Sequence, residues 1–313
     1  MKDKMQKIRP KSVRYIKLGE KGGWEDKCIE GSKPCLRLGF VNPHHRDCLS
    51  ENWRVLHDHY YRTEKKAKGK ATEITNEIKD FYTKDQNTLW VTFHKRRLFW
   101  CFARPEVEEL DDGTRGRRVI GRWSNQNVAG EELLVENLSG KLTMMQRFQG
   151  TICKVHEREY LIRKINGEIS PAVQYAQKCL GSLEESLSKL IRSLGWKDFE
   201  LLCDLIFTHS GWQRISKVGG AEKSIDLDLL LPVSGKRAFV QVKSQACKET
   251  FENYCETFEG LDQYDEMFFV VHTPQGDIDK WKVPKKVTLL FVSDIARLAV
   301  ASGLSEWIIR KNA

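Results

Sequence analysis

Apolar residues recur at helical spacing in the region that follows residue 182. The apolar face consists of Leu183, Leu187, Leu190, Ile191 and Leu194. This spacing predicts an amphipathic helix that Ser182 can cap and Gly195 ends. A second helix is predicted in "KDFELLCDLIFTHSG", with Asp198 as its N-cap and Gly211 after its last turn. Glu200 falls in the first turn of that helix, where the helix dipole alone favours a carboxylate.

Beyond Gly211 the pattern changes to short apolar runs separated by turn residues. Such runs are typical of strands, and turns are predicted at Gly219–Gly220 and Ser234–Gly235. In order, the predicted elements are strands in "WQRISKV", "SIDLDLLLP" and "RAFVQVKS", a helix in "CKETFENYCETFEGLDQY", strands in "EMFFVVHT" and "VTLLFV", and helices in "SDIARLAVASG" and "LSEWIIRK". The last third of the chain is therefore predicted to be an α/β domain.

The first half of the chain is predicted to be a β-rich α+β domain. The segments "NTLWVTFHKRRLFWCFARPEV" and "RRVIGRWSN" are rich in aromatic and β-branched residues, which favour strands. Upstream of them, Ile74, Ile78 and Phe81 lie in helical register within a charged segment, which predicts a surface helix. We expect an N-terminal domain over residues 1–165, a linker over residues 166–181 that contains Pro171, and a C-terminal domain over residues 182–313.

Four polar side chains interrupt the two apolar runs of the hairpin predicted over residues 223–244. Asp226 and Asp228 lie in the first run, and Gln241 and Lys243 lie in the second. Side chains two apart share one face of a strand. The alternate positions are apolar, namely Ile225, Leu227 and Leu229 in the first strand and Val240 and Val242 in the second. If Asp226 meets Gln241 and Lys243 at the open end of the hairpin, a carboxylate, an amide oxygen and an ammonium group converge.

This combination of groups suits phosphodiester hydrolysis. Hard oxygen ligands hold Mg²⁺, which polarises a phosphate and lowers the pKa of a bound water, and a nearby lysine can orient that water or offset the developing charge. A second interpretation assigns these residues a structural role without catalysis. In an edge hairpin, Asp226 and Lys243 would form a cross-strand ion pair and Gln241 would face solvent. The wholly apolar alternate positions favour the first interpretation.

Three segments taken together resemble a known enzyme family. "DFELLCDLIFTHSGW", "GGAEKSIDLDL" and "AFVQVKS", in this order, are similar to the Mrr-type catalytic domain of the PD-(D/E)XK nuclease superfamily. The resemblance covers about residues 182–310 and implies a restriction-endonuclease-like αβββαβ mixed sheet. The roles it implies are Asp226 as main metal ligand, Gln241 and the Val242 backbone carbonyl as further ligands, Lys243 as the catalytic lysine, and Glu200 as an accessory acid.

The chain departs from the family pattern just before the aspartate. Where the family has Asp-Gly-Gly, Glu222, Lys223 and Ser224 precede Ile225, and the glycines come earlier, at Gly219–Gly220. Asp228 is therefore an alternative or additional metal ligand. The cofactor that the resemblance implies is Mg²⁺, with Mn²⁺ as a substitute.

Basic residues are concentrated in the first half of the chain. Residues 1–170 hold 34 Lys and Arg against 24 Asp and Glu, whereas residues 171–313 hold 18 against 19, within a net charge of +9. A basic unit is typical of a nucleic-acid-binding module, although a solvated basic surface would have the same composition. The candidates for contacts with a nucleic-acid backbone are Lys95, Arg96, Arg97, Arg115, Arg117 and Arg118.

The aromatic residues of the first half allow two interpretations. They can fill the core of a small barrel, or one or two of them can stack on a base extruded from a duplex. The candidates for stacking are Trp90, Trp100 and Trp123. In its pattern, without a diagnostic motif, this half resembles the PUA-like or EVE-type domains that accompany modification-dependent restriction nucleases, which implies a reader of modified bases.

Several classes of protein are disfavoured by the sequence. No apolar run reaches the length of a membrane span, and the first residues are too polar for a signal peptide, so we expect a cytoplasmic protein without a membrane partner. Nine cysteines without a C-x-x-C pair indicate free thiols. We expect no zinc, because the spacing of Cys35, His44, His45 and Cys48 fits no standard zinc finger.

The sequence thus predicts a Mg²⁺-dependent DNA endonuclease, a restriction or phage-defence enzyme that acts on modified or foreign double-stranded DNA. Its N-terminal half would recognise the DNA and its C-terminal half would hydrolyse it. Because one active site cuts one strand, a double-strand break predicts a homodimer or a larger assembly. Two alternatives stay open: a non-catalytic DNA-binding or regulatory protein on a nuclease scaffold, and a nuclease for RNA or single strands.

Overall fold

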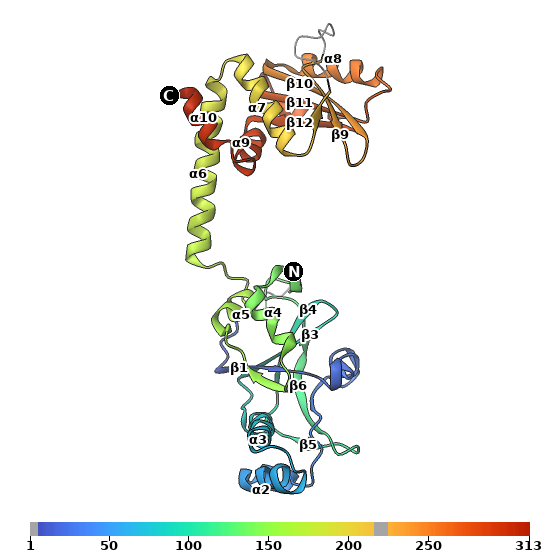
Figure 1. Ribbon diagram of the computed structural model, residues 1–313, viewed down its shortest axis with the longest axis vertical. Helices are drawn as coiled ribbons and strands as arrows, with labels where there is room; N and C mark the ends of the chain where they lie inside the picture. Colours follow the sequence, from blue (N-terminus) through green and yellow to red (C-terminus); the bar gives the residue numbers. More distant parts are fainter. Residues whose placement is uncertain (1–5, 216–224) are drawn as a thin grey trace. The chain divides into compact units, whose positions relative to one another are not determined.

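The chain folds into two compact units. The computed structural model describes residues 6–215 and 225–313, and the two units comprise Met1–Ser170 and Pro171–Ala313. Both units are mixed α/β regions (Figure 1). The division between them falls inside the segment 166–181 that the sequence marks as a boundary, and the basic surplus of the chain lies within the first unit.

The N-terminal unit is built on a curled sheet that forms a half-barrel. Six strands follow one path, in the order β2-β6-β4-β3-β1-β7, and β5 pairs with β6 beside that path. β1 and β3 pair in parallel, and the other neighbours on the path are antiparallel. The strands are β1 (Ser12–Ile16), β2 (Cys35–Leu38), β3 (Thr88–His94), β4 (Arg97–Ala103), β5 (Glu108–Glu109), β6 (Arg115–Ser124) and β7 (Ile152–Lys154).

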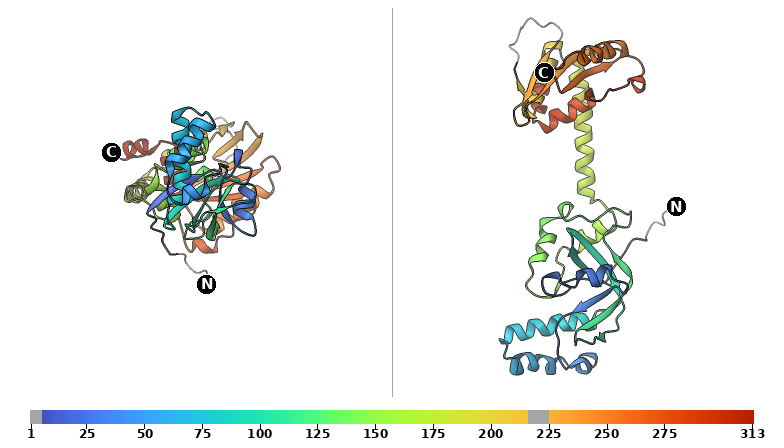
Figure 2. Two further views of the ribbon diagram at one scale, coloured as in Figure 1. Left: turned by 90° about the horizontal axis from the view of Figure 1, so that it is seen from below. Right: turned by 90° about the vertical axis from the view of Figure 1, so that its right-hand side faces the viewer.

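Helices cover this sheet. The α-helices of the unit are α1 (His45–Leu49), α2 (Trp53–Asp58), α3 (Lys68–Thr83), α4 (Gly140–Thr143) and α5 (Arg158–Ile165). Short 3₁₀ or π turns are η1 (Glu20–Gly22), η2 (Asp26–Glu30), η3 (His59–Thr63), η4 (Val135–Asn137) and η5 (Met144–Arg147). The longest of these helices, α3, runs beside α2 (Figures 1 and 2). Its buried residues Ile74, Ile78 and Phe81 confirm the predicted helical register.

Successive residues of β3 enter two different cores. Trp90 packs with Phe81 of α3 in one core, and Val91 packs with Leu161 of α5 in the other. Because side chains alternate between the faces of a strand, a strand whose neighbours are apolar on both sides must lie between two covered layers. The aromatic runs of this half therefore build the cores on both faces of the sheet.

The C-terminal unit has the element order that the sequence predicts. Its elements are α6 (Pro171–Ser193), α7 (Trp196–His209), β8 (Gln213–Arg214), β9 (Leu227–Leu231), β10 (Lys236–Ala246), α8 (Lys248–Glu259), β11 (Glu266–Pro274), η6 (Ile278–Lys280), β12 (Val287–Phe291), α9 (Val292–Ala301) and α10 (Ser305–Asn312). The sheet order is β12-β11-β10-β9-β8. β10, β11 and β12 run parallel, whereas β8 and β9 are antiparallel to their neighbours, so the sheet is mixed. The turn predicted at Gly219–Gly220 lies outside the described residues.

Two apolar cores sandwich this second sheet. On one face, β-strand residues such as Leu227 and Val240 pack with α6, α7, α9 and α10. On the other face, Phe239 packs with α8. Ile225 was expected beside Leu227 but packs against the α8 side, because it precedes β9 and the alternation of a strand does not extend to it.

Two predicted helix starts are wrong. α6 begins at Pro171 rather than after Ser182, so much of the predicted linker is helical. Proline is favoured in the first turn of a helix because its φ suits that position and its missing N–H is not needed there. α7 begins at Trp196, so Asp198 lies within its first turn and does not cap it; Asp198 instead pairs with Lys311.

Among the helices within residues 6–215 and 225–313, none is both long enough and apolar enough to cross a membrane.

Candidate active site

β9 and β10 bring Asp226 and Gln241 together at the open end of their hairpin. The antiparallel register pairs Leu227 with Val240, so the next residue in each direction places Asp226 beside Gln241. Asp226 Oδ2 accepts a hydrogen bond from the Val242 backbone N–H at 2.7 Å and another from Gln241 Nε2. These contacts produce the convergence at the open end that the strand periodicity predicts.

Lys243 belongs to the same group of side chains. Its Nζ lies 3.9 Å from Asp226 Oδ2, and its side chain is 31% exposed. The ammonium group also lies 5.3 Å from the centroid of the Tyr254 ring, a cation–π contact that restricts its position. A carboxylate, an amide and an ammonium group therefore lie together, with the ammonium accessible from solvent.

The edge-hairpin interpretation is wrong about the position of the strands and about Gln241, although the ion pair that it includes between Asp226 and Lys243 is present. β10 lies in the middle of the sheet, between β9 and β11, and β8 covers the outer side of β9. Gln241 is 1% exposed and does not face solvent. Burying an amide costs free energy unless its polar atoms are satisfied, so its presence in a central strand needs a chemical or structural reason.

Two carboxylates of α7 and an arginine of β8 line the same region. Glu200 and Asp204 lie one helical turn apart on α7. Arg214 Nη1 donates to Asp204 Oδ2 at 3.3 Å, and Arg214 Nη2 donates to the Asp226 carbonyl oxygen at 3.2 Å. The same Nη2 lies 3.8 Å from Glu200 Oε1. Arg214 thus connects the expected accessory acid Glu200 to the backbone of Asp226.

Sequence reasoning missed Asp204 and Arg214. Their segments are predicted as a helix and a strand, but nothing in the spacing of Arg214 relative to Asp226 marks it as a partner. The one available signal is the i, i+4 spacing of Glu200 and Asp204, which places both carboxylates on one face of a helix.

The pKa of Glu200 is raised above its ordinary value. Burial makes the largest contribution and repulsion by Asp226 also raises this pKa, while Arg214 and Lys243 lower it. These interactions place Glu200 within electrostatic reach of the Asp226 group. The accessory acid that the family resemblance implies therefore lies close enough to interact with the hairpin residues.

Several polar atoms of this group are buried without a hydrogen-bond partner in the described structure. They are Gln241 Oε1, Asp204 Oδ1 and Arg214 Nε. Nearly all buried polar groups in folded proteins find a partner, in the protein or in water. These three atoms are therefore open to a hydrogen bond with water or to a contact with an ion.

Asp228 lies two residues further along the chain and is engaged by another arginine. Arg237 Nη2 donates to both Asp228 carboxylate oxygens, at 3.1 and 2.9 Å. The residue beside Gln241 and Lys243 is thus Asp226. The departure from the family pattern at Glu222–Ser224 lies outside the described residues.

The three candidate tryptophans are core residues, which corrects the expectation that one of them stacks on a base. Trp90, Trp100 and Trp123 are 0%, 4% and 8% exposed. The indole N–H of Trp100 donates to the Gln126 carbonyl oxygen at 2.8 Å, and that of Trp123 donates to the Cys35 carbonyl oxygen at 3.4 Å. A base needs an exposed ring face, and these rings are covered by packing on both sides of the sheet.

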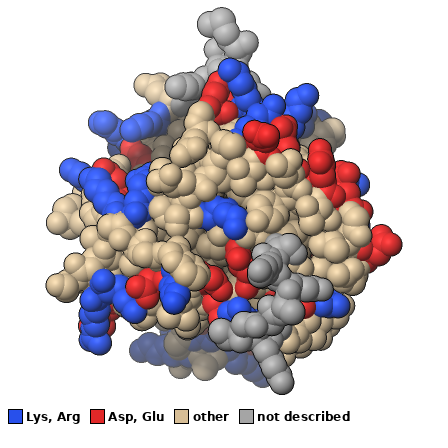
Figure 3. Space-filling view, turned by 90° about the horizontal axis from the view of Figure 1, so that it is seen from above, with Lys and Arg blue, Asp and Glu red and all other residues tan. Residues whose placement is uncertain are grey.

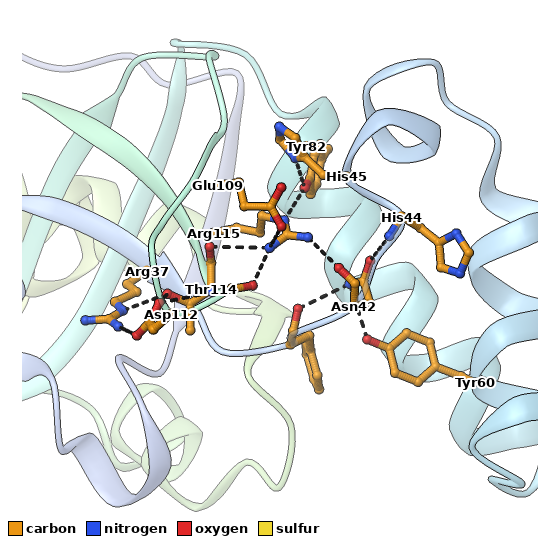
Figure 4. A network of polar contacts seen from close by, with 12 residues as sticks. Arg37, Asn42, His44, His45, Tyr60, Tyr82, Glu109, Asp112, Thr114 and Arg115 are labelled. Carbon is orange, nitrogen blue, oxygen red and sulfur yellow. Dashed lines mark hydrogen bonds and ion pairs between the residues drawn. The ribbon is translucent and has the colours of Figure 1, made fainter.

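Arg115 is buried in a polar network, so the expectation that it holds a nucleic-acid backbone is wrong. It is 0% exposed. Its guanidinium donates to the Tyr82 hydroxyl at 3.0 Å and to the Asn42 carbonyl oxygen at 2.6 Å, and its Nη1 lies 3.0 Å from Glu109 Oε1 (Figure 4). In this network the guanidinium ties β6 to α3 and to the chain before α1.

Arg117 is buried as well, and the same correction applies to it. It is 1% exposed. Its guanidinium donates to three backbone carbonyl oxygens, those of Arg104 at 2.7 Å, Phe81 at 2.9 Å and Lys84 at 2.9 Å. The strand alternation of β6 turns Arg115 and Arg117 inward, where they satisfy backbone groups.

The other four cations lie at the surface in ion pairs. The pairs are Lys95 with Asp26 and Glu30, Arg96 with Glu136, Arg97 with Glu132, and Arg118 with Glu108. The side chains of Arg96 and Arg118 are 83% and 73% exposed. Surface pairs of this kind are weak, so both arginines can exchange an acidic partner for a phosphate.

Asp26, Glu30 and His94 form a cluster that sequence reasoning missed, in which both carboxylates are exposed and the imidazole is largely covered. Their ligand atoms all lie within 4.8 Å of one another. Lys95 pairs with both carboxylates, so a cation already occupies the cluster. The residues come from η2 and from the end of β3, far apart in sequence, and no local pattern joins them.

The four residues considered as zinc ligands have separate surroundings. Cys35 Sγ lies 3.8 Å from Cys28 Sγ, His44 pairs with Asp47, His45 bonds the Tyr82 hydroxyl, and Cys48 is buried in the core. Cys35 also lines a pocket of about 490 Å³ between β2, β5 and β6, together with Lys33, Pro34, Leu110, Val119 and Arg118.

Acidic and basic side chains are interspersed on the face that Figure 3 presents.

Comparison with protein-family models, with curated proteins and with solved structures found no match to this chain.

Proposed function

We propose that the chain is a metal-dependent nuclease whose active site lies at the open end of the β9–β10 hairpin. The main support is the convergence of Asp226, Gln241 and Lys243 in a central part of the sheet. The order of elements and the mixed five-stranded sheet support assignment to the restriction-endonuclease-like fold. The Gln-x-Lys step at the end of the central strand supports the Mrr type within that fold.

The donor set fits a hard divalent cation. Asp226 offers a carboxylate, and Gln241 Oε1 is a buried acceptor that lacks a hydrogen-bond partner among the described residues. Carboxylate and amide or backbone carbonyl oxygens are the ligands that Mg²⁺ and Mn²⁺ prefer, so Asp226, Gln241 and the Val242 carbonyl would hold the ion. When bound, the ion would supply Lewis-acid polarisation of a phosphate and a more acidic water.

Two further side chains of the chain have roles in this proposal. Lys243 places its ammonium beside Asp226, where it can orient a water or offset the negative charge that develops on the phosphate. Glu200 has a raised pKa, which suits a group that exchanges a proton with water near the site.

The substrate we propose is double-stranded DNA of modified or foreign origin, bound through the N-terminal unit. Support comes from the 34 Lys and Arg against 24 Asp and Glu of residues 1–170, and from the exposed Arg96 and Arg118. Reading of a flipped base by the buried tryptophans is not part of the proposal. A double-strand break would require two chains related by a two-fold axis.

Cleavage assays with the full chain test this function. Duplex DNA that is unmodified, methylated, hydroxymethylated or glucosylated, together with single-stranded DNA and RNA, is incubated with Mg²⁺, Mn²⁺ or a chelator. We expect metal-dependent cleavage of duplex DNA. Asp226→Asn and Lys243→Met should each lower the rate by roughly 10²-fold or more. The matched control Asp228→Asn, in which the altered carboxylate pairs with Arg237, should retain the rate.

Three results would contradict the proposal in different ways. Undiminished cleavage by Asp226→Asn and Lys243→Met would place the site elsewhere. Binding of duplex DNA without any cleavage would favour a regulatory protein on a nuclease scaffold. Preferred cleavage of RNA or of single strands would change the substrate while leaving the site in place.

A further inference from the structure

Arg214 contacts the backbone of the proposed metal ligand Asp226 and the two carboxylates of α7. Its guanidinium donates to Asp204 Oδ2 at 3.3 Å and to the carbonyl oxygen of Asp226 at 3.2 Å, and lies 3.8 Å from Glu200 Oε1. The side chain is only 21% exposed. Removing one partner of a partly buried ion pair leaves an uncompensated charge, which is costly.

From these contacts we propose that Arg214 takes the place of a second divalent cation, so that the active site binds one ion per chain. This inference rests on the proposed nuclease function, because it concerns the same site. Glu200 and Asp204 are the carboxylates that a second ion beside Asp226 would need. Both of them are already paired with the guanidinium.

The arrangement of the carboxylates agrees with this assignment. Within residues 6–215 and 225–313, the carboxylate oxygens of Glu200, Asp204 and Asp226 do not form a group in which all lie within 4.8 Å of one another. They are therefore not arranged as one ligand cage for adjacent ions. The guanidinium contacts Asp204 through Nη1, and it contacts Glu200 and the backbone carbonyl oxygen of Asp226 through Nη2.

The charge of the site also fits a single ion. Glu200, Asp204 and Asp226 are matched by Arg214 and Lys243, which leaves one net negative charge. One divalent ion would change this to one positive charge, equal and opposite to that of one phosphodiester group. A second divalent ion would leave a large uncompensated positive charge in a partly buried site, which is electrostatically costly.

The test counts bound Mn²⁺, without any assay of activity. The full-length protein is titrated with Mn²⁺ alone, and free Mn²⁺ is measured by electron paramagnetic resonance. We expect one ion per chain in the wild type and two in Arg214→Gln, because the α7 carboxylates then lose their cation. Arg214→Lys keeps a positive charge and should bind one ion. Arg237→Gln, which removes the arginine paired with Asp228, is the matched control and should also bind one.

The possible outcomes separate this inference from the proposed function. Two ions in the wild type, or one ion in Arg214→Gln, would overturn the inference while leaving the metal site in place. No bound Mn²⁺ in the wild type would overturn the proposed metal site itself. Circular dichroism and urea unfolding of every variant establish that the counts come from folded protein, and the double variant Arg214→Gln with Asp204→Asn should return to one ion.

Discussion

Arg117 and Arg118 are adjacent in β6 but have opposite environments, and this contrast allows a sharp prediction. Arg117 is 1% exposed and donates to three backbone carbonyl oxygens. Burial lowers the pKa of its guanidinium to about 10. The side chain of Arg118 is 73% exposed and pairs with Glu108. Arg117→Met should therefore lower the free energy of unfolding, whereas Arg118→Met should leave it nearly unchanged and alter the salt dependence of DNA binding.

The size of the Arg117 effect follows from its contacts. Removing the guanidinium leaves three carbonyl oxygens without donors, at a cost of about 1–3 kcal/mol each. Part of this loss is offset. Burial of the Arg117 charge costs the wild type several kcal/mol, and the variant does not bear this cost. We expect the free energy of unfolding to fall by about 2–4 kcal/mol, which corresponds to a decrease in the melting temperature of roughly 4–16 °C for a unit of this size.

Urea unfolding of the full chain, followed by circular dichroism, measures this change. Arg118→Met should alter the free energy of unfolding by less than about 0.5 kcal/mol. In a DNA-binding titration over a range of salt concentrations, Arg118→Met should reduce the salt dependence of binding, because the variant lacks one of the proposed phosphate contacts. Equal stability of wild type and Arg117→Met would refute the assignment of Arg117 as a structural cation.

Two further predictions concern the contact between α3 and β7. Burial raises the pKa of Glu77 although its Oε2 accepts two backbone N–H bonds. The folded state then binds this proton more tightly than the unfolded state, so Glu77 weakens folding as pH rises through and above its ordinary pKa. The free energy of unfolding of Glu77→Gln, measured by urea titration, should rise relative to that of wild type as the pH rises from about 4 to about 7. A difference between the two proteins that does not change with pH would contradict this expectation. Gly150→Ala should lower the free energy of unfolding by about 1–3 kcal/mol, because the added methyl carbon would lie 2.6 Å from the Phe148 ring. Gly69 has open space around it, so Gly69→Ala is the control and should not be destabilised.

The fold of the C-terminal unit could be predicted from its sequence to a large extent. The helical spacing of Leu187 and Ile191 and the strand-like runs around β9 and β10 are local patterns, and local patterns determine the type of each element. The ends of the helices were less predictable. A proline such as Pro171 can either break a helix or begin one, and the surrounding packing decides which of the two happens.

Part of the candidate site was also accessible from the sequence. Asp226 directly precedes β9, and Gln241 and Lys243 lie on β10, which a short turn joins to β9. For such a hairpin, the side-chain alternation and the turn position fix which residues meet. Arg214 was not accessible in this way, because its contacts with Glu200 and Asp204 depend on how β8 packs against α7.

The N-terminal unit shows where sequence reasoning fails. Composition correctly indicates a basic, aromatic-rich, β-containing region, but composition does not tell a buried arginine from an exposed one. Arg117 is buried because carbonyl oxygens at the end of α3, more than thirty residues away in sequence, converge on the inward face of β6. Trp90 is covered because α3 packs over β3. The types and order of the elements and the polar group of the hairpin depend on residues that are close in the chain, so local patterns predict them. Contacts between segments that are distant in sequence determine which cations are structural, which aromatic faces are covered and which arginine enters the site, so these features follow from the folded chain and not from any local pattern.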